Sequence, residues 1–126
     1  MAVFPYLGNY GHGYDDKAQG VLRTYPDLSY RFYKKSNSIR TEMPLVFSRY
    51  DQTRVNAIRA FFATNAFLSF FVYDPAVVSA VDPTGASATG RHTAIFQADD
   101  GAAPELSVKN LGRCIYDVEI RFILLD

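Results

Sequence analysis

The sequence predicts a mainly β fold of the α+β class, an antiparallel β-sandwich or barrel-like sheet that carries one amphipathic α-helix. Apolar and polar side chains alternate along several segments, which is the two-residue period of a strand. Residues 51–65 show the spacing of a helix instead. Strands, one helix and further strands form an order typical of an antiparallel sheet with a helix on one face. With 126 residues, 48% of them hydrophobic, residues 1–126 are predicted to form a single domain.

The chain before the helix is predicted to contain a loop-rich arm and two strands. Residues 1–25 form the arm, because their four glycines favour turns. Residues 28–34 alternate as a strand does, Lys35–Ser38 supplies a polar turn, and residues 39–48 alternate again. Because Pro44 has no N–H to donate, we expect this second strand to lie at a sheet edge at that point.

The predicted helix has one apolar face and two recognisable ends. Asp51 is expected to cap its start or to lie in its first turn, and Asn65 to take the left-handed conformation that ends it. The face expected to meet the core carries Val55, Ile58, Phe61 and Phe62.

The chain after the helix returns to strands. Residues 67–73 are apolar on both faces, which predicts a strand covered by the helix on one side and by something else on the other. Asp74 and Pro75 end this strand. Residues 76–89 are rich in small residues and are predicted to be a loop insertion, either a long loop or a short hairpin. Further strands are expected at residues 91–97, 106–109 and 114–125, with an acidic turn at 99–101.

The charge balance bears on partners and location. Thirteen basic residues match thirteen acidic ones, so no global field exists to hold nucleic acid or an anionic membrane. The N-terminus lacks the pattern of a secretory signal, and no stretch is long enough to cross a bilayer. Synthesis in the cytoplasm is therefore expected.

No segment predicts an active site. The sequence contains no convincing match to a nucleophile with its base, to a metal-ligand set or to a phosphate loop. His12 lies in a glycine-rich turn and His92 in a predicted strand far along the chain, which does not favour a metal site. Cys114, the single cysteine, is expected to be a buried inert thiol. We expect no enzyme, no catalytic or metal-binding residue and no cofactor.

Tyrosine is concentrated in the first third of the chain. Its amphipathic ring suits three roles: ordinary packing, contact area in a protein interface, or a platform for a sugar. The interface interpretation, together with the doubly apolar stretch at 67–73, gives five candidate residues for a subunit contact, namely Tyr10, Tyr14, Phe67, Phe71 and Tyr73.

Three segments stand in an order that resembles the distal tail proteins of long-tailed bacteriophages, the minor tail protein M type. They are Tyr10-Gly11-His12-Gly13-Tyr14, a strand into a helix that ends Ala60-Phe61-Phe62-Ala63-Thr64-Asn65, and Phe70-Phe71-Val72-Tyr73-Asp74-Pro75. The resemblance covers most of the chain in order. The sequence departs from the family in a longer stretch between Tyr14 and the strand before the helix, and in the small residues of 76–89.

The resemblance implies a tail-tube-like fold and a structural role in the virion. Six copies are expected to form a ring at the tail tip, between the tail tube protein and the baseplate hub protein, with an open lumen for DNA. A neutral chain suits transient passage of DNA, because strong phosphate binding would retard ejection. A tail tube or tail terminator subunit shares this plan. A carbohydrate-binding module for receptor recognition is the alternative from another class.

Overall fold

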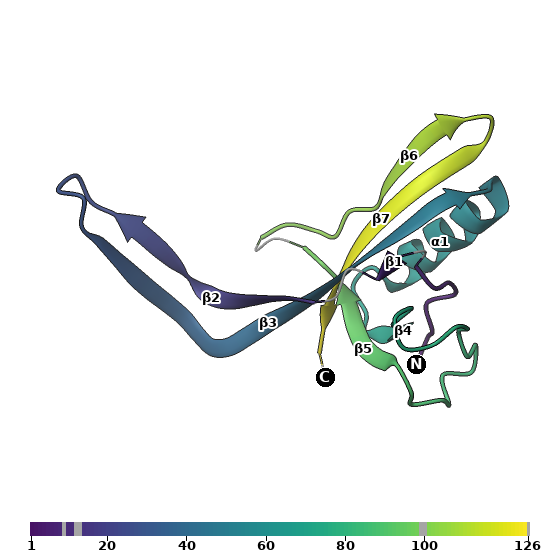
Figure 1. The fold of residues 1–126 in the computed structure, drawn as a ribbon, viewed down its shortest axis with the longest axis horizontal. Coiled ribbons are helices and arrows are strands. Elements are labelled where there is room, and N and C mark those ends of the chain that lie inside the picture. The colour runs from purple at the N-terminus through teal and green to yellow at the C-terminus, as the bar shows by residue number, and fades with distance from the viewer. Residues whose placement is uncertain (9, 12–13, 99–100, 126) are drawn as a thin grey trace.

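A computed structural model describes residues 1–8, 10–11, 14–98 and 101–125, and among them not the side chains of residues 10–11, 19–21, 30 and 32–39. The described chain holds seven strands and one helix (Figure 1). The elements are β1 (Tyr10–Gly11), β2 (Asp15–Thr24), β3 (Tyr30–Tyr50), α1 (Gln52–Asn65), β4 (Phe70–Tyr73), β5 (Arg91–Phe96), β6 (Ser107–Gly112) and β7 (Ile115–Leu124).

All seven strands belong to one antiparallel sheet, in the order β1-β3-β7-β5-β4, with β2 also paired to β3 and β6 to β7. The prediction of a mainly β fold with a single helix is confirmed. The described strands make one sheet, and no second sheet of these strands faces it. Beyond β4, Phe4 donates its N–H to the carbonyl of Phe71 at 2.8 Å, and Val3 pairs with Phe71 in parallel. The first residues therefore cover the edge of β4.

The core lies between α1 and one face of the sheet. Register places Phe47 opposite Val118 and Leu45 opposite Ile120, and all four side chains are buried. Phenylalanine rings from five segments close the space under the helix at centroid distances of 4.8–6.5 Å, mostly tilted or edge-on, as ring quadrupoles favour. These rings belong to Phe4, Phe61, Phe70, Phe96 and Phe122.

The helix begins as predicted and ends differently. The Asp51 carboxylate accepts a hydrogen bond from the N–H of Arg54 at 2.9 Å, so the predicted cap is confirmed. Asn65 does not take the left-handed conformation, because the chain continues through Ala66 with a φ of −57°. Its buried amide instead donates to the carbonyl of Phe61 at 3.1 Å, one turn earlier.

The loop-rich arm predicted for residues 1–25 is wrong from Asp15 onward, where β2 pairs with β3. The turn predicted at Lys35–Ser38 is also wrong, because β3 runs through it without a break. The polar stretch coincides with an irregularity: Ala18 pairs with Ile39 and Gly20 with Lys34, so four residues of β3 lie opposite Gln19. Extra residues on one strand of a pair bend that strand locally and increase its twist. Figure 1 shows the resulting bend in β3.

Pro44 does not mark a sheet edge, because β3 pairs with β7 on one side and with β1 and β2 on the other. Pro44 itself lies opposite Arg121. On its other side it faces the interval between Gly11, the last residue of β1, and Asp15, the first of β2. A missing N–H costs little where a neighbouring ladder is interrupted.

The chain after the helix departs from the predictions at two places. The strand expected at 67–73 begins only at Phe70, because the turn after α1 occupies the earlier residues and leaves Phe67 81% exposed. Cys114 is exposed in a two-residue turn between β6 and β7, where a positive φ of 58° excludes it from the predicted strand. Residues 76–89 are confirmed as a loop. Of the predicted turn at 99–101, Asp99 and Asp100 lie outside the described residues.

The buried face of α1 predicts a large loss of stability on truncation. Ile58→Ala should lower the free energy of unfolding by about 2–5 kcal/mol, because it leaves a cavity under a fully buried side chain. Arg59→Ala, on the exposed side of the same turn, should change it by less than about 0.5 kcal/mol. Urea unfolding of both variants measures the difference, and equal losses would contradict the assigned helix face.

Candidate functional site

A hairpin projects from the body of the protein (Figure 1). It comprises residues 15–40, that is β2 and the first part of β3, and is called the projecting hairpin below. Ten residues of β2 at roughly 3.3 Å each extend it by about 33 Å. Its described side chains beyond the base are exposed, at residues 22–29 and 31. A two-stranded ribbon without a packed face is marginal in water, so this element is suited to contact another molecule.

The turn at the end of the projecting hairpin holds a leucine in an unusual conformation. Tyr25 and Leu28 close a β-turn through a hydrogen bond from the N–H of Leu28 at 3.0 Å, and Ser29 accepts from Tyr25 at 2.8 Å. Leu28 follows with a φ of 67°, the left-handed region where such turns favour glycine. Its side chain is 83% exposed. An apolar side chain kept at a strained, exposed position is a candidate contact residue.

A buried carboxylate lies where the projecting hairpin joins the body. Glu42 has no exposed side-chain area, and its Oε2 atom lies 2.6 Å from Arg40 Nη2 and 3.2 Å from Lys17 Nζ. Its Oε1 atom lies 3.7 Å from Arg121 Nη1, which also contacts Asp15 at 2.7 Å. Two cations come from the projecting hairpin and one from β7. The cluster therefore ties the hairpin to the body through Glu42, with the Asp15–Arg121 pair beside it.

The Glu42 cluster is incompletely paired. The Oε1 atom is buried and accepts no hydrogen bond from any described residue, although Arg121 is near it. A buried charge is costly unless its partners surround it, so removal of one partner from such a cluster destabilises strongly. The position of the hairpin on the body is thus sensitive to this one carboxylate.

A second group of polar side chains lies at the root of β2. Tyr14 donates a hydrogen bond from its hydroxyl to the buried carboxylate of Asp74, and the same hydroxyl lies 3.2 Å from Nε2 of His92. These residues come from the segment before β2, from the loop after β4 and from β5. The contacts anchor the chain just before it enters the projecting hairpin.

The structure separates the five residues predicted for a subunit contact. Tyr14 and Phe67 are exposed, whereas Tyr73 is 1% exposed and donates its hydroxyl to the carbonyl of Ser87 at 2.8 Å. Tyr73 therefore offers no surface to a partner in this conformation. Phe71 is half-buried, and the side chain of Tyr10 lies outside the described residues.

The loop at 76–89 is fastened to the body. The Arg91 guanidinium lies over the Phe71 ring at 4.4 Å and donates to the carbonyl of Gly85 at 2.6 Å. Within the loop, hydrogen bonds from the Thr84 hydroxyl, then from the N–H of Ser87 and of Thr84, hold the pKa of the Asp82 carboxyl below its ordinary 3.8. Nothing in the small-residue composition indicated these contacts.

Sequence patterns did not predict the projecting hairpin, which is the main candidate site. Residues 15–24 lack a clean alternation, because a ribbon open on both faces needs no buried side. The available signal was the alternation on both sides of Lys35–Ser38, at residues 28–34 and 39–48, since the polar residues between them were interpreted as a turn.

Two other kinds of site, a metal centre and a membrane-spanning helix, are absent from the described residues. No three or more His, Cys, Asp or Glu side chains come together in a group able to hold a metal ion in the part of the chain that the structure describes. Over the same residues, no helix has the length and apolar character needed to cross a membrane.

Comparison of the chain with protein-family models found no matching family, and searches of curated proteins and of solved structures found no match.

The Glu42 cluster predicts a charge-dependent loss of stability. Glu42→Gln should lower the free energy of unfolding by about 1–3 kcal/mol, because three cations then face a neutral amide in a partly buried site. Asp16→Asn is the matched control, since exposed Asp16 accepts one hydrogen bond, from Thr41, at the same base. Its expected cost is below about 1 kcal/mol. Urea unfolding that finds Glu42→Gln as stable as the parent would contradict the role given to this cluster.

Proposed function

We propose that this chain is a structural protein of a bacteriophage tail tip that acts by assembly and not by catalysis. Six copies form a ring that joins the tail tube to the baseplate hub and leaves a lumen for DNA. The observation that carries the proposal is the projecting hairpin, an element about 33 Å long that extends away from its own core.

The projecting hairpin favours a closed assembly of identical copies. A contact between the hairpin of one copy and a different surface of the next is head to tail, and such contacts close into rings when the rotation between copies allows it. Each copy then supplies the packing that its neighbour's hairpin lacks. The exposed apolar side chains Leu22, Tyr25 and Leu28 are suited to that contact.

The segments that resemble the distal tail family fall on structurally related elements. The glycine-rich segment at residues 10–14 joins β1 to the start of β2, and of it residues 12–13 lie outside the described part of the chain. The aromatic end of α1 and the strand β4 meet in the core, where the Phe61 and Phe70 rings are 5.1 Å apart. The resemblance thus involves both the root of the projecting hairpin and the core beside it, which supports a common architecture.

The proposal extends to location and partners. The chain is made in the host cytoplasm and resides in the virion, in contact with the tail tube protein, the baseplate hub protein and five further copies of itself. Its balanced charge suits a lumen through which DNA passes without being held. A tail tube or tail terminator subunit would use the same ring, and labelling of the protein in virions by immuno-electron microscopy separates these positions.

Four of the described tyrosines do not form a sugar-binding platform with one another. Tyr50 and Tyr73 are buried, Tyr14 lies at the root of the projecting hairpin, and Tyr25 lies at its far end. These four rings therefore do not share one surface, whereas a sugar platform needs several rings side by side.

Removal of the distal hairpin should prevent assembly without unfolding the body. In this variant Gln19–Ser38 is deleted, and Ala18 is joined to Ile39, its partner in the ladder, by an Asn-Gly turn. The Glu42 cluster keeps Lys17, Arg40 and Arg121. Circular dichroism and thermal melting should find a folded chain, and negative-stain microscopy should find rings for the full-length protein alone. Rings formed by the shortened chain would contradict the proposal.

Leu28→Gly should separate assembly from folding. Relief of the left-handed strain and the greater freedom of glycine in the unfolded chain oppose each other, each at about 1 kcal/mol, so stability should stay within that range. Loss of the exposed leucine should raise the concentration needed for ring formation about tenfold, as expected when 1–2 kcal/mol of contact is removed. Sedimentation velocity measures assembly, and unchanged assembly would exclude Leu28 from the contact.

A further inference from the structure

A groove lies beside β7, between the end of β5 and the start of β6. Register places Val46, Glu119 and Ser107 in one row across β3, β7 and β6. Leu45 and Phe47, the neighbours of Val46, are buried toward the helix, so this row faces the opposite way. The groove beside it measures about 280 Å³ and its lining includes Glu105, Ser107, Glu119 and Arg121.

The groove belongs to the acidic part of the chain. Residues 97–119 carry five acidic residues against Lys109 and Arg113, a net charge of −3. Glu105 and Glu119 are exposed where they line the groove. The cation that lines it, Arg121, is already engaged, since its guanidinium contacts Asp15 at 2.7 Å and approaches Glu42 at 3.7 Å. The two glutamates therefore give the groove a negative charge.

The distal hairpin carries the opposite charge. Residues 19–38 contain four basic residues against a single acidic one, Asp27, a net charge of +3. Arg23 and Arg31 are directly opposite each other in the ladder, and both are exposed. Cross-strand partners share a face, so this face of the hairpin presents two guanidinium groups side by side.

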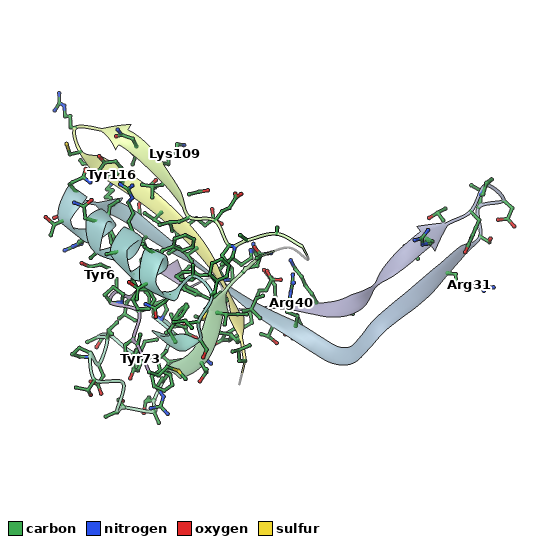
Figure 2. All side chains as sticks on the ribbon, turned by 180° about the vertical axis from the view of Figure 1, so that it is seen from behind. Tyr6, Arg31, Arg40, Tyr73, Lys109 and Tyr116 are labelled. Atoms are coloured by element: carbon green, nitrogen blue, oxygen red, sulfur yellow. The ribbon has the colours of Figure 1, made fainter. Side chains whose placement is uncertain are left out.

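The two charged surfaces do not meet within one copy. Figure 2 places Arg31 at one end of the molecule and Lys109, on β6, toward the other. The projecting hairpin extends away from β6 and β7 (Figure 1). A groove on this chain is therefore open to the hairpin of another copy.

We propose that Arg23 and Arg31 of one copy dock onto Glu105 and Glu119 in the groove of the next copy. This inference rests on the proposed ring and names the contact that closes it. Guanidinium and carboxylate groups form short, charge-assisted and often bidentate hydrogen bonds, which fix both the partner and the orientation. Charge complementarity of this kind selects the hairpin end over other surfaces and speeds the encounter.

A charge-exchange experiment tests the docking with the full-length chain. The variant Arg23→Glu with Arg31→Glu, and the variant Glu105→Arg with Glu119→Arg, should each raise the concentration for half-assembly at least about tenfold, measured by sedimentation velocity. An equimolar mixture of the two variants should recover association between unlike chains, because a reversed groove then meets a reversed hairpin. Parent assembly should weaken as NaCl rises from about 50 to about 500 mM. Arg59→Glu, on the exposed side of α1, is the control and should assemble as the parent does.

The outcomes separate this inference from the proposed function. If the parent forms rings and both double variants form them equally well, or if the mixture fails to recover association, the docking is overturned and the ring stands. If the parent stays monomeric at every concentration, with and without tail tube protein, both are overturned. Should a reversed variant fail to fold by circular dichroism, Arg23→Gln with Arg31→Gln replaces it and should weaken assembly about threefold or more in the same direction.

Discussion

The carboxylate of Glu42 lies at the point on which the arrangement of this protein depends. β3 is one continuous strand, but its two halves have different surroundings: the second half packs in the core and the first half belongs to the projecting hairpin. Glu42 lies between them and gathers Lys17, Arg40 and Arg121 from three strands. Because a buried carboxylate is favourable only with such partners, the cluster fixes where the hairpin leaves the body. The direction of the hairpin follows from this junction and from the bulge beyond Ile39.

The two faces of the sheet differ in what covers them. One face is filled by α1 and by a set of phenylalanine rings, with the first residues of the chain closing the edge of β4. The other face keeps charged side chains, among them Glu119 and the Asp15–Arg121 pair. A sheet covered on one face only leaves the second face available to a neighbour. The basic distal hairpin and the acidic groove are complementary features of the same chain.

Local patterns in the sequence were sufficient for the helix and the core, and insufficient for the site. Asp51 and the apolar spacing of Val55 and Ile58 act within one segment, so they predict α1 directly. The alternation of apolar and polar residues likewise predicts β7 directly. Glu42 looks like an ordinary polar-face residue, since its burial depends on cations contributed by other strands. The hairpin was hidden for a related reason: its contacts are expected in another copy, and a strand without a core face has no strict period. Cys114 was misjudged because a turn of two residues, and not burial, decides its place.

The proposed assembly requires that a neighbouring copy covers the projecting hairpin. Hydrogen–deuterium exchange of the full-length protein, followed from dilute monomer to assembled ring, tests it most directly, because exposed ribbons open easily and packed ones do not. The backbone amides of β2 and of the first part of β3 should gain protection on assembly, while those of α1 and the core end of β7 should stay as they are. Equal protection of the hairpin in monomer and assembly, or protection gained only in the body, would contradict the account.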